Sequence, residues 1–384
     1  MTKKSDTPAI RFKGFTDTWE QRKVSELFRV TRGYVLAATQ TETTKTDEKP
    51  YPVYSSQTKD KGLMGYYKDY LYEDAITWTT DGANAGTVNY RAGKFYCTNV
   101  CGVLLSNEVK ANQMIAEALN SVAKGYVSYV GNPKLMNNVM ADIVIQIPTQ
   151  AEEREQLSSF FAKLDNLITL HQRKYDKLTN VKKSMLEKMF PKNGSNVPEI
   201  RFKGFTEAWE QRKFEEIAVR SSVICSDDTL PRVEYEDIVS GTGRLNKDIY
   251  AKQSSKSGIT FHQGDVLYGK LRPYLQNWLL PTFDGLAVGD FWVLQPQNAD
   301  SSFLYRLIQS RQFDEVANQS TGTKMPRADW KLVSKTVFSI PSNISEQAAI
   351  GTYFTALDNL ITLHQRELEK LKNIKKSCLE NMFV

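Results

Sequence analysis

Side chains that can hydrogen-bond to nucleobases gather in two glycine-rich segments of the chain. Residues 51–105 alternate short strand-like runs with turn residues such as Asp81-Gly82, and a second segment contains GDVLYGKLRPYLQNW and QSTGTKMPRADW. Arg and Lys pair with guanine edges and Asn or Gln with adenine edges, so loops of this composition could read bases. The candidates are Tyr54, Ser55, Ser56, Lys59, Trp78, Thr80, Asn84, Arg91 and Asn99 in the first segment, and Tyr268, Lys270, Arg272, Tyr274, Asn277, Thr323, Lys324 and Arg327 in the second.

Signatures of catalysis are missing from the sequence. The GK pair at residues 269–270 is followed by leucine and does not form a phosphate loop, and no GxSxG motif or adenine-methyltransferase NPPY motif is present. Cys97 and Cys101 have CxxxC spacing but lack a second close pair, so no zinc site is expected. We therefore predict no catalytic residue, no metal site and no cofactor in this chain, and an enzyme acting alone is the weakest hypothesis.

The sequence blocks that should form the framework for these loops each occur twice in the chain. IRFKGFTDTWEQRK at residues 10–23 returns as IRFKGFTEAWEQRK at residues 200–213, with 12 of 14 positions identical. LDNLITLHQR at residues 164–173 returns unchanged at residues 357–366. The segments between these repeats, roughly 24–146 and 214–339, share little visible sequence. The chain thus offers one repeated surface twice and two different surfaces once each.

The second repeat predicts two long helices that pack as a coiled coil. Apolar residues recur at gaps of four and three from Leu157 and from Ile350 onward, which is the 3.5-residue period of a left-handed coil. Capping boxes are predicted at Thr149-x-x-Glu152 and Asn343-x-x-Glu346. Each helix should be about 38 residues, or roughly 57 Å, long. The predicted interface residues are Phe161, Leu164, Ile168, His171, Leu178, Phe354, Leu357, Ile361, His364 and Leu371.

Antiparallel packing of the two helices is the simplest geometry. The second variable segment must leave the end of the first helix and enter the start of the second, which a parallel pair would separate by the full helix length. The two end domains would then be related by a pseudo-two-fold axis. His171 and His364 are interpreted as satisfied interface residues. Lys182-Lys183 and Lys375-Lys376 are interpreted as solvated helix faces, with contact to a DNA backbone as the alternative.

Composition and charge narrow the class further. The net charge is +6, but residues 24–150 hold 12 basic and 12 acidic residues. If the chain binds DNA, much of the phosphate contact should therefore come from a partner. Four cysteines, no secretory signal and no apolar run of the roughly 18–20 residues needed to span a bilayer predict a cytoplasmic protein without membrane contact.

This alternation of variable segment and repeated helix closely resembles the specificity subunit of type I restriction-modification systems. The resemblance covers essentially the whole chain and is carried by the IRFKGFTxxWEQRK repeat, DGANAGTVNYR, GDVLYGKLRPY, FDGLAVGDFWVL and the Ile-Pro step before each LDNLITLHQR helix. It implies an α+β chain with two mixed, mainly β target-recognition domains separated by a long antiparallel two-helix coiled coil. The expected divisions are 1–149 and 191–341 for the recognition domains and 150–190 and 342–384 for the helices.

The resemblance also implies a function and partners. Each recognition domain would read one half of a bipartite site in double-stranded DNA, and the helices would set the spacer and dock two DNA methyltransferase subunits. Restriction subunits would complete the assembly, and S-adenosylmethionine, ATP and Mg would be bound by the partners. The alternative from the residues alone is a non-enzymatic assembly protein with two unrelated protein-binding end domains.

Overall fold

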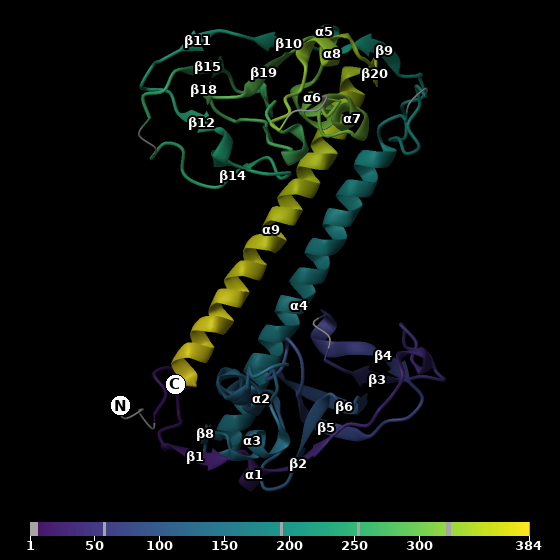
Figure 1. Cartoon of the computed structure of the whole chain (residues 1–384). Coiled ribbons are helices and arrows are strands. Elements are labelled where there is room, and N and C mark those ends of the chain that lie inside the picture. Colours follow the sequence, from purple (N-terminus) through teal and green to yellow (C-terminus); the bar gives the residue numbers. More distant parts are fainter. Residues whose placement is uncertain (1–6, 57–58, 193–194, 252–253, 320–323, 384) are drawn as a thin grey trace. The chain divides into compact units, whose positions relative to one another are not determined.

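The computed structural model describes residues 7–56, 59–192, 195–251, 254–319 and 324–383. The chain divides into two compact units: unit 1 comprises Met1–Gln172 and Arg366–Val384, and unit 2 comprises Arg173–Gln365. Each unit holds a strand-rich region and part of both long helices, α4 (Ala151–Lys188) and α9 (Ile344–Met382) (Figure 1). These helices have 38 and 39 residues, so the sequence predicted their number and length correctly. No helix in the described part of the chain is long and apolar enough to cross a membrane.

Unit 1 is built on a six-stranded sheet in the order β2-β7-β5-β6-β3-β4. Its only parallel pairing joins β3 to β6 among the described residues. The strands are β2 (Phe28–Arg32), β3 (Tyr51–Tyr54), β4 (Leu63–Tyr67), β5 (Tyr72–Thr79), β6 (Val88–Cys97) and β7 (Cys101–Ser106), and the short helices are α1 (Val24–Leu27), α2 (Gln113–Val122) and α3 (Asn137–Asp142).

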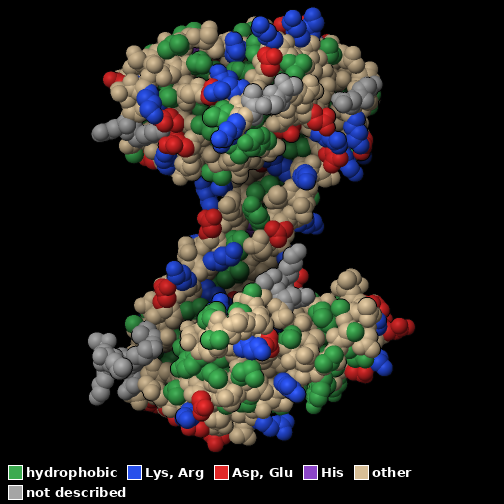
Figure 2. Space-filling view, in the orientation of Figure 1, with side chains coloured by type: hydrophobic (Ala, Val, Ile, Leu, Met, Phe, Trp, Pro, Cys, Tyr) green, Lys and Arg blue, Asp and Glu red, His purple; other side chains and the backbone are tan. Residues whose placement is uncertain are grey.

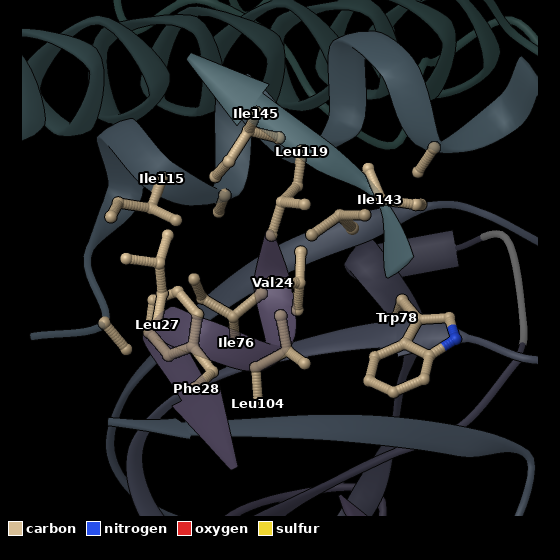
Figure 3. Close-up of a cluster of buried hydrophobic side chains, with 14 of the residues drawn as sticks. Val24, Leu27, Phe28, Ile76, Trp78, Leu104, Ile115, Leu119, Ile143 and Ile145 are labelled. Carbon is tan, nitrogen blue, oxygen red and sulfur yellow. The ribbon is translucent and has the colours of Figure 1, made fainter. Parts of the chain in front are cut away.

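The central strands of unit 1 are buried on both faces. Ile76 and Trp78 of β5 contribute to a core that includes Ile115 and Leu119 of α2 (Figure 3). Ala75 of β5 belongs to a second, smaller cluster. Successive side chains of a strand point to opposite faces, so this division follows from the two-residue period. The strand is therefore buried at every position from Ala75 to Thr79, although two of these residues are threonines.

Unit 2 is built on two four-stranded sheets. The first has the order β10-β19-β16-β17 and the second β11-β15-β18-β12. Val266 and Tyr268 of β16 face a core shared with the helices, whereas Leu267 between them faces the core of the second sheet. The elements are α5 (Phe214–Ile217), β10 (Ala218–Ser221), β11 (Ile224–Cys225), β12 (Arg232–Glu234), β13 (Ile238–Val239), β14 (Arg244–Leu245), β15 (Gly258–Phe261), β16 (Val266–Gly269), β17 (Trp278–Leu279), β18 (Gly285–Val288), β19 (Phe291–Pro296), α6 (Ser301–Leu307), α7 (Arg311–Ala317) and α8 (Trp330–Lys335).

A two-stranded ribbon closes the base of each unit. In unit 1, β1 (Trp19–Lys23) pairs antiparallel with β8 (Val144–Pro148), and in unit 2, β9 (Glu210–Lys213) pairs with β20 (Val337–Ile340). The first strand of each ribbon belongs to the 14-residue repeat, and the second is the apolar strand that runs into Ile-Pro. Each variable segment therefore leaves and re-enters its ribbon at neighbouring positions.

A buried carboxylate explains the arginine and tryptophan of the 14-residue repeat. In unit 1, Arg11 donates to both oxygens of Glu153 at 2.6 and 2.7 Å, and Trp19 Nε1 donates to the same carboxylate at 3.4 Å. Arg201 and Trp209 bind Glu346 of unit 2 in the same way, at 2.6, 2.7 and 3.3 Å. We call each set a helix-start clamp, because its glutamate lies in the first turn of α4 or α9.

The clamps correct the predicted capping boxes. The carboxylate of Glu346 is occupied by Arg201 and Trp209. Its equivalent in unit 1 is Glu153, because Glu152 is exposed and lies one position earlier. Asn343 does cap α9, since its Oδ1 accepts from the Ser345 N–H at 2.8 Å. The repeat therefore fastens each long helix to its own strand-rich region rather than only starting the helix.

Within each unit, stretches of α4 and α9 contact one another. In unit 1, Phe161 meets Phe383, the residue that follows α9, with ring centroids 5.7 Å apart, and Asp165 pairs with Lys375 at 2.7 Å. As the numbering rises along α4 it falls along α9, so these stretches run antiparallel. In unit 2, Lys182 pairs with Asp358 at 2.7 Å. The two ion pairs use the same two positions of the repeat, with the roles of the helices exchanged.

The predicted interface residues differ in burial. Phe161, Leu164, Phe354 and Leu357 are buried, whereas Ile168, Leu178, Ile361, Leu371 and both seam histidines are half-buried. His171 and His364 both have interaction partners. Lys182 and Lys375 correct the prediction of a solvated face, because their side chains are only 14% and 20% exposed and each is ion-paired. Their neighbours Lys183 and Lys376 are exposed.

Candidate nucleic-acid interface

Three loops of unit 1 bring most of its candidate residues together. Thr98 Oγ1, in the turn between β6 and β7, donates to Ser55 Oγ at 3.0 Å. Asn84 Nδ2 donates to the Ser56 carbonyl at 2.9 Å, and the Thr80 N–H donates to the Val100 carbonyl at 3.0 Å. Residues 54–56, 80–86 and 98–100 therefore form one continuous edge of the domain, as a shared reading surface requires. Asn99 at this edge is exposed, and Tyr54, Ser55, Ser56 and Asn84 are half-buried.

Three candidates in unit 1 lie inside the domain. Trp78 is 1% exposed and its Nε1 donates to the Leu135 carbonyl at 3.1 Å. A Cβ on Gly102 would come within 2.1 Å of the Trp78 ring, so this glycine makes room for the indole. Arg91 and Thr80 are each 7% exposed. Side chains with so little free surface cannot contact a base edge. The prediction that these three residues contact bases is therefore corrected: they support the loops instead.

The Arg91 side chain shows how such support works. Its guanidinium stacks over the Tyr54 ring, 3.6 Å from the centroid. It also donates to Thr77 Oγ1 at 3.0 Å and to the Lys61 carbonyl at 2.7 Å. Arg91 therefore fixes the loop that carries Tyr54 and Ser55 rather than pointing toward a ligand. The side chain of Lys59, in the same loop, lies outside the described residues.

The candidates of unit 2 also converge on one edge. Backbone hydrogen bonds join the loop after β16 to the segment before α8: the Arg272 N–H donates to the Pro326 carbonyl at 2.7 Å, and the Ala328 N–H to the Lys270 carbonyl at 2.8 Å. Arg272 and Lys270 are half-buried, whereas Tyr274, Lys324 and Arg327 are exposed. Thr323 lies outside the described residues.

Two candidates of unit 2 are corrected in the same way as Trp78. Tyr268 is 2% exposed and stacks on Trp292 with ring centroids 5.5 Å apart. Asn277 is 4% exposed, and its Oδ1 accepts from Ser240 Oγ at 2.9 Å. Both residues flank the loop at residues 270–276 in the sequence, and their side chains are packed inside the domain. The sequence showed that these residues lie close to this edge. It could not show whether their side chains point into the domain or toward solvent.

One carboxylate, that of Asp290, pairs with two of the basic candidates at this edge of unit 2. Asp290 pairs with Arg327 at 3.1 Å and with Lys270 at 3.6 Å. The hydrogen bond from Arg327 lowers the pKa of Asp290, since its effect outweighs that of burial. On the face shown in Figure 2, basic and acidic side chains are interspersed over both units.

Sequence reasoning missed a hairpin and a nearby loop in unit 1. Tyr129 and Val130 are 70% and 93% exposed at the tip of a hairpin between α2 and α3, and Tyr34 and Val35 are exposed beside the turn at residues 98–100. The Gly131-Asn132-Pro133 turn signal, flanked by Tyr and Val, could have identified the hairpin. No group of three or more His, Cys, Asp or Glu that could hold a metal exists among the described residues.

The helix ion pairs extend differently toward each strand-rich region. In unit 1, Lys375 also binds Glu117 of α2 at 2.6 Å, and Asp165 binds Lys61 at 2.9 Å. In unit 2, Asp358 is bound by Arg306 of α6 at 2.7 Å. The Asp-Lys pair that occurs in both units thus binds different side chains of the variable segment in each unit. Lys61 lies close to residues 54–56, because the Ser55 N–H donates to the carbonyl of the next residue, Gly62, at 2.8 Å.

We expect Asp165→Asn to destabilise unit 1 by about 1–3 kcal/mol at neutral pH, because Lys375 and Lys61 lose a charged acceptor. Burial alone would raise the pKa of Asp165, but the hydrogen bonds and charges of Lys375 and Lys61 lower it below its ordinary value of 3.8. A carboxylate with a depressed pKa stabilises the fold above the unfolded pKa, and this contribution is lost as the pH falls. Urea unfolding should therefore show a constant difference from wild type between pH 7 and 5 that shrinks below about pH 4.

The matched control is Asp142→Asn, whose ion pair with Lys23 is largely exposed and should matter little. Equal destabilisation by both variants, or a difference that grows in acid, would contradict the role assigned to Asp165.

The sequence model of one family matches most of the chain. It is described as the type I restriction modification DNA specificity domain, and it matches twice, at residues 16–180 and 208–373. A putative type I specificity subunit N-terminus from Mycoplasma pneumoniae is 37% identical over 131 residues, covering 33% of this chain and 68% of that protein. The specificity subunit of the type I restriction enzyme MjaVIII from Methanocaldococcus jannaschii is 22% identical, covering 94% of this chain and 91% of that one.

The chain spans between 39% and 61% of the length of further mycoplasma specificity subunits that it matches. The crystal structure of a type I restriction-modification system S subunit from M. genitalium matches with a TM-score of 0.71. That match covers 98% of this chain and 99% of the other at 14% identity, and it shows the fold. With two matched copies of the domain, this chain belongs to the family of type I restriction-modification DNA specificity subunits.

Proposed function

We propose that this chain is the non-catalytic DNA reader of a type I restriction-modification complex. Each unit recognises one half of a bipartite site through the edge formed by its loops. The observation that carries the proposal is the repetition of one framework around two unlike edges: the helix-start clamps and the Asp-Lys pairs recur residue for residue. The loops they support differ in both sequence and charge. One framework with two readers suits a target made of two different half-sites.

The helices serve in this proposal as a spacer of fixed length. α4 and α9 pair as an antiparallel coiled coil, which relates the two units by a pseudo-two-fold axis and holds the half-sites apart. The antiparallel contacts inside unit 1 and the exchanged ion pair in unit 2 support this arrangement. The recognition domains then correspond to residues 1–149 and 191–341, and the helices to 150–190 and 342–384.

Two methyltransferase subunits are the proposed partners, together with restriction subunits and double-stranded DNA in the cytoplasm. The LDNLITLHQR repeat leaves Leu167 and Leu170 at 44% and 47% exposure in unit 1. The same two positions in unit 2, Leu360 and Leu363, are 44% and 52% exposed. Exposed leucine pairs repeated on identical sequence suit two copies of one partner. Methyl transfer, ATP use and cleavage, with their cofactors, belong in this proposal to the partners.

The test of the proposal is methylome sequencing of a host that expresses this chain with its methyltransferase. We expect adenine methylation at one bipartite sequence with a fixed spacer, and none when this chain is omitted. Methylation without the chain, or at a single continuous motif, would contradict the proposal. Binding of partner proteins without any sequence preference would favour the alternative of an assembly protein.

Replacing one leucine pair should remove one partner only. Leu167→Asp with Leu170→Asp should lower the mass of the purified complex by one methyltransferase, because charged residues replace the apolar contact. Leu360→Asp with Leu363→Asp should do the same for the other copy, and the four changes together should release both subunits. Native mass spectrometry measures the stoichiometry. Leu332→Asp is the control, since Leu332 is an exposed helical leucine outside the repeat, at 38% exposure. Retention of both partners in all variants would refute this docking surface.

A further inference from the structure

The Ser128–Lys134 hairpin of unit 1 is firmly held beside the reading edge. Ser128 and Lys134 exchange backbone hydrogen bonds of 2.8 and 2.9 Å across its base. The Leu135 N–H donates to the Thr80 carbonyl at 2.8 Å, and the Gly82 N–H donates to the Pro133 carbonyl at 3.0 Å. Gly131 adopts the left-handed conformation that closes the turn, with φ of 76°. The hairpin is therefore fixed to the loop at residues 80–86 by main-chain bonds.

The tip of this hairpin presents apolar side chains to solvent. Val130 is 93% exposed and Tyr129 70% exposed, and Tyr126 and Met136 nearby are 48% and 53% exposed. Single exposed apolar residues are ordinary on protein surfaces, but several on one short protruding segment mark a contact site. The side chain of Val130 has no polar atom, so it is suited to contact an apolar group of a partner.

The charge of this segment favours nucleic acid as the partner. Between residues 118 and 141 the only charged side chains are Lys124 and Lys134, both exposed, so the segment has no acidic residue to repel phosphate. Lys134 lies 3.8 Å from Asp81 of the reading edge, a loose contact that a phosphate could replace. Basic residues flanking an apolar tip match the composition of a duplex groove, in which phosphates border the base edges.

We propose that Val130, flanked by Tyr129, contacts the C5 methyl group of a thymine in the major groove of the half-site read by unit 1. This inference rests on the proposed function. The thymine methyl is the apolar group that base pairs display in the major groove, and apolar side chains are its ordinary contacts. The hairpin thus adds a base reader that none of the hydrogen-bonding candidates provides.

Uracil in place of thymine tests the contact, because it removes this methyl group and leaves the base-pairing hydrogen bonds intact. The complex of this chain with its methyltransferase would be titrated with duplexes of the methylome-defined site, each with one thymine replaced by deoxyuridine. We expect one position in the half-site of unit 1 to lower the affinity of the wild type about four-fold, the value for one buried methyl group. In Val130→Ala the same replacement should change the affinity less than two-fold.

Val223→Ala is the matched control, because Val223 is an exposed valine of unit 2, at 66% exposure, and its substitution should leave the uracil response of the unit 1 half-site intact. The inference is overturned if no thymine in that half-site responds to uracil, or if Val130→Ala responds as the wild type does. It is also overturned if Val130→Ala weakens binding of the methyltransferase instead. A wild-type complex that does not distinguish the site from a scrambled duplex would refute the proposed function itself.

Discussion

A chain in which residues 214–336 replace residues 24–143 is expected to recognise the half-site of unit 2 twice. The two segments have equivalent ends, since the Val24 N–H donates to the Ile143 carbonyl at 2.9 Å and the Phe214 N–H to the Thr336 carbonyl at 3.0 Å. The transplanted segment would therefore enter and leave the ribbon of β1 and β8 as it does the ribbon of β9 and β20.

The contacts with the long helices also favour this exchange. In unit 2, Arg306 of the variable segment binds Asp358 of α9. The repeat position of Asp358 is occupied by Asp165 in unit 1, where Glu117 and Lys61 of the native segment bind the Asp165–Lys375 pair. After the exchange, Arg306 would lie beside Asp165, which takes the position of Asp358. Lys375 would take the position of Lys182. The charges of these ion pairs all keep a partner, which favours folding of the hybrid.

Methylome sequencing of a host carrying the hybrid and the methyltransferase measures the outcome. The proposed antiparallel helices orient the two units oppositely, so the new site should be an inverted repeat of one half-site with the spacer unchanged. Specific sites exceed unspecific DNA by typically 10³–10⁷-fold in affinity, so the original site should lose nearly all methylation. The reciprocal exchange, with residues 24–143 in place of 214–336, should duplicate the other half-site. An unchanged motif, or loss of both halves, would contradict the assignment of one reader to each unit.

The long helices and the two-fold repetition could be predicted from sequence because their signals are periodic and local. Apolar spacing set the extent of α4 and α9, and the repeated motifs located equivalent positions in both units. The placement of Ser55 and Asn84 in loops also followed from turn residues at the ends of strands. Helical period, turn chemistry and repetition each act over a few residues, which is why they can be seen without coordinates.

Burial and long-range charge pairing could not be predicted in the same way. Trp78 and Tyr268 resemble loop aromatics in sequence, yet they lie within β5 and β16 and their side chains belong to the cores. Lys375 lies in a lysine pair typical of a solvated helix face, and only the packing of α2 beside α9 brings Glu117 to it. Glu153 and Arg11 are 142 positions apart in the chain. Such contacts depend on tertiary packing, which periodicity does not encode.

The helix-start clamps should be the most sensitive positions for stability. Glu153 has a fully buried side chain and Arg11 is 10% exposed, so removing the carboxylate leaves a buried guanidinium and the Trp19 N–H without an acceptor. Breaking a buried pair by deleting one partner costs about 3–5 kcal/mol. We expect Glu153→Ala to destabilise unit 1 by this amount. Glu346→Ala should do the same to unit 2, where the side chains of Arg201 and Glu346 are 15% and 1% exposed.

Urea unfolding at neutral pH, followed by hydrogen exchange to localise the loss, measures both effects. Glu153→Ala should remove protection from β1, β8 and the first turns of α4, while unit 2 stays protected, and Glu346→Ala should give the mirror result. Glu152→Ala is the matched control, because Glu152 lies in the same helical turn but is exposed, and a charge near a helix N-terminus contributes only about 0.3–1 kcal/mol. Equal losses for Glu152→Ala and Glu153→Ala would show that the carboxylate acts through the helix dipole alone. A loss of stability in Glu153→Ala but not in Glu152→Ala, with methylation failing at one half-site first, would give the opposite result. It would show that the clamp attaches each recognition domain to its long helix.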